Sequence, residues 1–233
     1  MENQLERLKG AFLAIISHEL RTPLTEIITA LNLLQDNYTG SLNAQQRNYI
    51  AIADNAASHL DMLISDLIAF AQLQAETVET RREATLLAEL VSYVVEQHRA
   101  RAQAQHLNLL FSAPQRLPPV PVDRSLMTRV VANLIINAIN FTPPGGHVMV
   151  RISAAVNEQC IVVQDTGVGI PEEKQDRLFE SFYQAADSLT RQVGGLGIGL
   201  AYARRIVEAH HGKITFASVE GKGSTFTVHL PTQ

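Results

Sequence analysis

The segment SHELRTP, at residues 17–23, holds residue types that could do acid–base chemistry. Apolar residues around it are spaced three or four apart, as on one face of a helix, and His18 lies off that stripe, pointing to solvent. Glu19 is an adjacent carboxylate that can hold or deprotonate an imidazole. Thr22 lies one turn on, and Pro23 favours a kink there. An ordinary surface histidine is the alternative, but a kink costs stability, so these three neighbours favour a site.

A second group of polar residues follows much later in the chain. Asn133 and Asn137 are four residues apart, so on a helix their carboxamides face one site. Asp165, Gly167 and Gly169 follow a strand-like apolar run in VVQDTGVGIP. An aspartate at a strand end offers a hydrogen-bond acceptor, and the glycines allow the backbone to approach a ligand closely.

A glycine-rich segment then precedes a predicted helix. Gly195, Gly197 and Gly199 lie in GGLGIGLAYARRIVEAHHG, and main-chain N–H groups at a helix N-terminus favour phosphate oxygens. The spacing lacks the third glycine of the dinucleotide fingerprint, and no strand comes directly before it. No Gly-Lys-Ser/Thr occurs either, so a Rossmann site and a P-loop are both poor interpretations.

Two long helices are expected to carry His18. Residues 5–34 form one amphipathic helix, residues 36–43 hold the turn, and residues 44–75 form a second helix. Each helix has a long apolar seam, and two helices alone cannot cover both seams. The economical solution is a homodimer in which two hairpins form a four-helix bundle. Residues 1–78 are therefore predicted to be a dimerisation hairpin.

The rest of the chain, residues 86–233, mixes strands and helices after a charged linker at residues 79–85. Helices are expected at residues 86–103, 124–140 and 198–211, and strands at 107–112, 148–155, 159–164, 213–219 and 224–230. This order predicts an α/β sandwich with a mostly antiparallel sheet and helices on one face.

Taken together, these motifs resemble those of sensor histidine kinases of bacterial two-component systems. FLAIISHELRTPLTEI is similar to their phosphoacceptor box, and the asparagine motif, DTGVG and the GxGxG motif follow in the order of their ATP-binding domain. The resemblance spans nearly the whole chain. It implies an ATP-dependent protein histidine kinase that autophosphorylates His18 and passes the phosphoryl group to an aspartate of a response-regulator receiver domain, with possible phosphatase activity toward that partner.

The resemblance also implies a role for each matching residue. On the hairpin, Glu19 is the acid–base partner of His18, and Thr22 positions water for dephosphorylation of the partner. Asn137 coordinates Mg²⁺. The remaining expected contacts to ATP come from one set of residues: Asn133, Phe141, Asp165, Gly167, Gly169, Arg191, Gly195, Gly197, Gly199 and Thr225.

Three positions depart from the family pattern. Asn140 stands where the asparagine box often has lysine, Gln184 where the aromatic box often ends in arginine, and Leu196 where Thr or Ser is common. Each departure removes a possible phosphate contact. Arg191 lies in residues 178–195, which have the length of a mobile lid, and could supply a charge instead.

Composition excludes several classes of protein. The chain has 233 residues, of which 46% are hydrophobic and 18% charged, so wholesale disorder is excluded. A net charge of −4 argues against nucleic-acid binding through a basic face. No apolar run approaches the roughly 18–20 residues that cross a bilayer, so no membrane contact and a cytoplasmic location are expected for this segment. The polar start MENQLERLKG is unlike a signal peptide.

The single cysteine and the other histidines are expected to be structural. Cys160 is interpreted as a small core residue of a strand, and no internal disulfide is possible. The other histidines, His229 among them, show no shared spacing of metal ligands.

Two other functions are compatible with the motifs. One is an adaptor that dimerises and binds nucleotide without transferring phosphate. The other is an ATPase of the gyrase or chaperone type, although those proteins lack the His-Glu-x-x-Thr-Pro helix. Phosphoprotein formation separates these alternatives.

Overall fold

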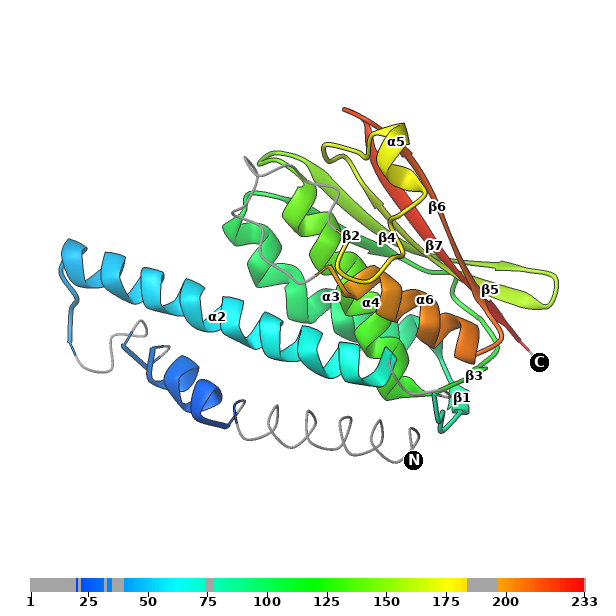
Figure 1. The fold of residues 1–233 in the computed structure, drawn as a ribbon, viewed down its shortest axis with the longest axis horizontal. Coiled ribbons are helices and arrows are strands. Elements are labelled where there is room, and N and C mark those ends of the chain that lie inside the picture. The colour runs from blue at the N-terminus through cyan, green and yellow to red at the C-terminus, as the bar shows by residue number, and fades with distance from the viewer. Residues whose placement is uncertain are drawn as a thin grey trace. The chain divides into compact units, whose positions relative to one another are not determined.

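The computed structural model describes residues 20, 22–31, 33–34, 40–73, 78–183 and 197–232. The chain divides into two compact units, one ending at Glu76 and the other beginning at Thr77. Figure 1 shows the long helix of the first unit and the mixed helices and strands of the second. Among the described helices, none combines the length and the apolar character needed to cross a membrane.

The first unit is a pair of helices. Residues 22–31 are helical, and α2 runs over Ala44–Leu73. A capping box begins α2, because Asn43 Oδ1 accepts from Gln46 N at 2.8 Å while Gln46 Oε1 accepts from Asn43 N at 2.9 Å. The two helices share an apolar core, and in each of them the buried residues are seven apart. This core consists of Leu24, Leu31, Ala57 and Ile64, with Ile28 and Ile50 packed against it.

Other large apolar residues of the first unit stay exposed. Between 44% and 61% of each remains accessible. These residues are Leu20, Ile27, Leu33, Tyr49, Ile52 and Leu60. In the described residues, one helix pair thus buries part of the predicted apolar stripes and leaves the rest exposed.

The second unit is built on a five-stranded sheet in the order β2-β4-β5-β7-β6. The strands are β2 (Asn108–Ser112), β4 (His147–Ala155), β5 (Glu158–Asp165), β6 (Lys213–Val219) and β7 (Gly223–Pro231). β2 pairs with β4 in parallel, and the other three pairings are antiparallel. The mostly antiparallel sheet was predicted from the sequence.

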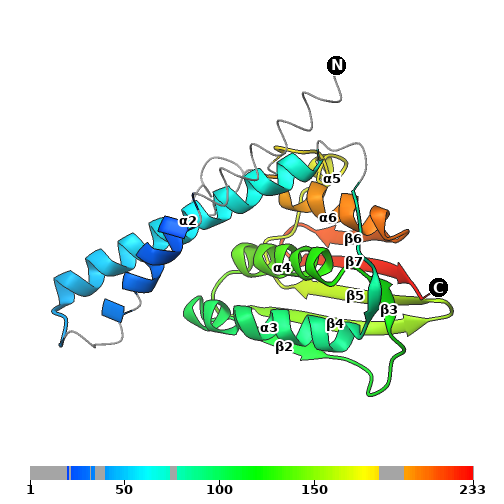
Figure 2. The ribbon, with the colours of Figure 1, turned by 90° about the horizontal axis from the view of Figure 1, so that it is seen from below.

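Helices cover one face of this sheet, as Figure 2 shows. They are α3 (Leu87–Ala104), α4 (Arg124–Phe141) and α6 (Gly199–Ala209), and a single short turn, α5 (Glu172–Gln175), lies apart from them. Alternate strand residues such as Val150, Ile161 and Val228 face these helices and are fully buried. The α/β sandwich with helices on one face is therefore confirmed.

A small second sheet joins β1 (Glu83–Thr85) to β3 (Val120–Val122). Arg81 N also donates to Asp123 Oδ2 at 2.9 Å, and the Arg82 guanidinium donates to the carbonyl of Ala209 at 2.6 Å. These residues were expected in a linker over 79–85. The structure instead makes them part of the second unit, because the strand pairing holds them there.

Candidate functional site

Helix α4 carries the asparagine pair. Its first turn is capped by Asp123, whose Oδ1 accepts from Leu126 N at 3.1 Å. Its apolar side is buried against the sheet and the neighbouring helices, whereas Asn133 and Asn137 lie half-buried, one turn apart, on the other side. The helical period therefore presents both carboxamides in one direction, as the four-residue spacing predicted.

Asn133, on α4, contacts the first residue of α6. Its Nδ2 donates to the carbonyl of Gly199 at 3.4 Å, a long hydrogen bond. A Cβ atom at Gly199 would lie 3.7 Å from the Asn133 carboxamide carbon. The asparagine box and the end of the glycine-rich segment, which are 66 residues apart, thus meet at one place.

Asp165 ends β5 and is buried, with 7% of its surface accessible. Its Oδ1 accepts two main-chain hydrogen bonds, from Gly167 N at 2.8 Å and from Ser224 N at 3.1 Å. Burial raises the pKa of Asp165, and the two N–H donors act in the opposite direction because they favour the carboxylate. The side chain is held as an oriented acceptor at the C-terminal end of a central strand.

The loop after Asp165 packs closely on the end of α4. Val168 N donates to the carbonyl of Phe141 at 3.1 Å, and a Cβ atom at Gly167 would overlap that carbonyl oxygen. Gly169 adopts a φ of +66°, and a Cβ atom there would overlap the carbonyl of Val219. Only glycine suits these two positions, so the DTGVG motif brings the loop against Phe141, which is 38% exposed.

Thr225 is not brought to Asp165. The register pairs Thr225 with Gln164, so strand alternation puts Thr225 on the opposite face of the sheet from Asp165. The neighbour of Asp165 on β7 is Ser224, whose N–H bonds to the carboxylate and whose Oγ lies 2.9 Å from Ser218 Oγ. The expectation for Thr225 is corrected to Ser224. The sequence alternation alone could not reveal this, because it does not give the register between β5 and β7.

Several predicted site residues lie outside the described part of the chain. These are His18, Glu19, Arg191 and Gly195. Thr22 is described, in the helical segment 22–31, with an exposed side chain. Gly197 is described as well, and its carbonyl accepts from Phe182 N at 3.1 Å.

Arg101 is a residue that the sequence analysis missed. It lies in the last turn of α3, and its guanidinium donates to Asn140 Oδ1 at 3.0 Å. Asn140 occupies the position where a lysine is common in the family that the sequence resembles. A cation from α3 therefore lies beside the position where this chain has asparagine instead of lysine. Only the tertiary structure reveals this contact.

Comparison with known families divides the chain in the same two parts. Residues 8–76 match the His Kinase A (phospho-acceptor) domain. Residues 122–233 match the histidine kinase-, DNA gyrase B- and HSP90-like ATPase family. Together the two matches cover most of the chain and include all the motifs described above.

Characterised relatives are histidine kinases. The circadian input-output histidine kinase CikA of Synechococcus elongatus is 37% identical over 97% of this chain and 30% of its own length. The sensor histidine kinase WalK of Bacillus subtilis is 32% identical over 99% of this chain and 38% of its own length. The adaptive-response sensory kinase SasA of Synechococcus sp. strain JA-3-3Ab is 37% identical over 99% and 61%, respectively. The chain thus spans about a third of the length of the first two relatives.

Solved structures share the fold. Full-length ShkA in complex with AMPPNP is 29% identical, with a TM-score of 0.70 over 95% of this chain and 46% of that one. The Acinetobacter baumannii histidine kinase AdeS is similar in fold, at 23% identity and a TM-score of 0.61 over 93% and 98% of the two chains.

The hairpin and the sandwich with its asparagine, aspartate and glycine site define a protein of the phospho-acceptor and ATPase type. Within that class, the chain belongs to the sensor histidine kinases and contains their catalytic core.

Proposed function

We propose that this chain is an ATP-dependent protein histidine kinase that phosphorylates its own His18. The observation that carries the proposal is that α4 meets both other motifs: Asn133 bonds to Gly199, and the loop after Asp165 packs on Phe141. An imidazole nitrogen of His18 attacks the γ-phosphorus of ATP. The N–P bond forms as the bond from that phosphorus to the bridging oxygen breaks, ADP leaves, and Glu19 takes the imidazole proton.

Some site residues are assigned to contact the adenine base of ATP, and others are assigned to contact its phosphates. Asp165 Oδ1 already accepts two main-chain bonds, so Oδ2 is assigned to the adenine amino group, with Gly167, Gly169 and Phe141 against the base. Gly199 begins α6, where main-chain N–H groups favour phosphate oxygens. Gly195 and Gly197 precede it in the sequence and are assigned to the phosphates with it.

A magnesium ion fits the asparagine pair. Amide oxygens are hard donors of the kind Mg²⁺ accepts alongside phosphate and water, and Asn137 is half-buried on the side of α4 that Asn133 shares. Bound there, the ion would neutralise charge on the transferring phosphates. Asn137 would hold it through Oδ1, and Asn133 would line the same pocket.

Arg101 supports phosphate binding in place of the missing lysine. Its hydrogen bond to Asn140 keeps a guanidinium at the C-terminal end of the asparagine helix. A nearby cation favours anionic phosphates over water, although an exposed charge contributes only modestly. This contact weakens one reason for the adaptor interpretation, which is the loss of a phosphate-binding lysine.

The partners follow from the hairpin. We infer a homodimer, because six large apolar residues among those described in the hairpin remain exposed in one chain. We also infer transfer from His18 to an aspartate of a receiver domain. Thr22 is exposed on its helix, as a residue that positions water for dephosphorylation of that partner must be. A cytoplasmic location, where ATP and such a partner are found, fits this role.

Incubation with labelled ATP tests the proposal. Wild-type protein should acquire an acid-labile, base-resistant label, and His18→Gln should acquire none. His59→Gln, which changes the other histidine of the hairpin, is the matched control and should label normally. Nucleotide binding without label would favour the adaptor, and steady ATP hydrolysis without phosphoprotein would favour the ATPase.

A further inference from the structure

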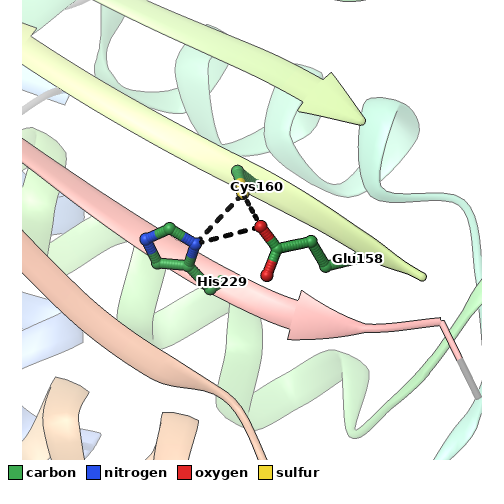
Figure 3. A group of neighbouring side chains, drawn as sticks. All are labelled: Glu158, Cys160 and His229. Carbon is green, nitrogen blue, oxygen red and sulfur yellow. Dashed lines mark hydrogen bonds and ion pairs between the residues drawn. The ribbon is translucent and has the colours of Figure 1, made fainter. Parts of the chain in front are cut away.

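A cluster of three possible metal ligands lies in the second unit, away from the nucleotide site. Glu158 and Cys160 are alternate residues of β5, and His229 is the cross-strand partner of Cys160 on β7. All three side chains project from the face of the sheet that the helices do not cover, because their neighbours Gln159 and Leu230 face the core. Figure 3 shows the three side chains turned toward one another.

The distances in this cluster match those of a zinc site. Cys160 Sγ lies 3.3 Å from His229 Nδ1 and 3.7 Å from Glu158 Oε1, and the Nδ1–Oε1 distance is 3.5 Å. Zinc bonds of about 2.3 Å to sulfur and about 2.0–2.1 Å to nitrogen and oxygen separate tetrahedral ligand atoms by about 3.3–3.6 Å. The three atoms thus occupy three corners of such a tetrahedron with shifts of a few tenths of an ångström.

A second residue orients the imidazole for this role. Thr215 Oγ1, on β6, lies 3.0 Å from His229 Nε2. If Nε2 carries the proton and donates it to Thr215, Nδ1 is left with its lone pair toward Cys160 and Glu158. Metal-bound histidines in proteins are commonly fixed in this way through the other ring nitrogen.

The cluster is also accessible and suited in charge. Glu158 and His229 keep 36% and 20% of their side chains exposed, so an ion can reach them from solvent. Without a metal, burial and the nearby Glu158 charge raise the pKa of the Cys160 thiol, which donates to Glu158 Oε1. A bound metal ion replaces that thiol proton, and one thiolate with one carboxylate then balances a divalent charge.

We propose that Glu158, Cys160 and His229 form a Zn²⁺ site with water as the fourth ligand. Mixed S, N and O donors at these spacings suit zinc better than Mg²⁺ or Ca²⁺. The ion would tie together the central strands β5 and β7, whose other ends carry Asp165 and Ser224. Asp165 lies five positions beyond Cys160 along β5, which is about 17 Å. The zinc site is therefore distinct from the nucleotide site, and it does not depend on the proposed kinase activity.

Metal titration of the full, untagged chain without nucleotide tests the inference. Co²⁺ should bind one per chain and give a thiolate-to-metal charge-transfer band, and Zn²⁺ should displace it. Zn²⁺ affinity, measured by competition with a chromogenic chelator, should fall at least tenfold in Cys160→Ser, Glu158→Gln and His229→Ala. Thr215→Val should weaken it by about tenfold as well, because it removes the orienting contact.

His147→Ala is the matched control, because His147 is an exposed strand histidine that bonds to Asn108 and lies outside the cluster. It should bind Zn²⁺ as the wild type does. Far-UV circular dichroism checks that each variant is folded. Glu158→Gln should disturb folding least, because Glu158 is more exposed than His229 and glutamine has nearly the same shape. A Co²⁺ complex with no sulfur band, or unchanged Zn²⁺ affinity in folded Glu158→Gln and Thr215→Val, would show that the three residues are only a hydrogen-bonded surface cluster.

Discussion

Asp165 combines a buried carboxylate with two main-chain donors on a single oxygen, which fixes what its second oxygen can do. In Asp165→Asn, the amide oxygen can keep both main-chain bonds, but its NH₂ then meets the adenine NH₂ donor to donor. We expect affinity for a non-hydrolysable ATP analogue to fall by about 1.5–3 kcal/mol, roughly 10- to 150-fold, by calorimetry.

The control for this prediction is Thr225→Val, which keeps shape and changes a residue on the other face of the sheet. Its affinity should stay within about twofold of wild type. Acidification gives a second readout. Burial raises the pKa of Asp165 in the folded protein, so its carboxylate becomes protonated at a higher pH than that of an ordinary aspartate, whose pKa is about 3.9. Nucleotide binding by the wild type should therefore begin to weaken at that higher pH. Equal loss in both variants would contradict the register assigned here.

The charge of Arg101 can be tested separately from the packing of its side chain. Arg101→Met keeps a long side chain and removes the charge beside Asn140. ATP affinity should fall about two- to fivefold, corresponding to about 0.5–1 kcal/mol for an exposed charge, and the deficit should shrink at high salt. Arg99→Met on the same helix, where Arg99 pairs with Glu96, should leave affinity unchanged. A deficit that is insensitive to salt would indicate altered packing instead.

At the scale of elements, His210 connects the end of α6 to the start of α4. Its Nε2 accepts from Asp123 N at 2.8 Å, and its Nδ1 donates to the carbonyl of Ile206 at 2.7 Å. Asp123 in turn caps α4 and accepts from Arg81 N. The neutral ring makes both hydrogen bonds. Protonation of Nε2 would turn its N–H toward the N–H of Asp123, which cannot accept a hydrogen bond.

This arrangement predicts a pH dependence of stability. Burial lowers the pKa of His210, so the unfolded chain binds a proton below pH about 6.5 while the folded chain does not. The free energy of unfolding should therefore decrease as pH falls below about 6.5, by up to about 1.4 kcal/mol per pH unit until the folded pKa is reached.

Urea unfolding at pH 8 and pH 5.5 measures this effect. His210→Gln, whose side-chain oxygen can accept from Asp123 N, should be less stable at pH 8 but lose less stability on acidification. Some dependence should remain, since burial also lowers the pKa of His98. If the variant and the wild type show the same slope, His210 is not responsible.

Prediction from sequence succeeded for elements that have a local pattern. The helices α3, α4 and α6 and the five strands of the main sheet lie within two residues of the predicted bounds. β1 and β3 were missed because each is only three residues long, and β3 contains Pro121 within a proline-rich stretch. Their pairing joins residues far apart in the chain, which no local periodicity encodes.

The same limit applies to side chains. Asn133 and Gly199 were placed in one site because their family motifs are local, and the structure brings them together. The Cys160–His229 pair and the bond from Arg101 to Asn140 depend on register and helix packing. The sequence analysis therefore interpreted Cys160 and His229 as structural and did not consider Arg101. Cys160 is indeed buried, but on the helix-free face of the sheet and beside a histidine 69 residues away.

For the whole molecule, the hairpin is the part through which we expect two chains to associate. Its core residues Ala57 and Ile64 lie on one side of α2, and the exposed Tyr49 and Leu60 lie on an adjacent side. A second hairpin related by twofold symmetry can bury that side, which gives a four-helix bundle.

Leu60→Lys tests this assembly. Burying the exposed part of a leucine contributes about 1 kcal/mol, and a twofold interface contains the residue twice, so the dimer should weaken by at least about 2 kcal/mol, roughly 30-fold. Sedimentation equilibrium should detect the shift to monomer. Ala51→Lys introduces the same charge about 180° around α2, at an exposed position, and should remain dimeric. Because the substitution leaves the nucleotide site of the second unit intact, ATP-analogue affinity per chain should be unchanged in both variants. A fully dimeric Leu60→Lys protein would place the interface elsewhere on the chain.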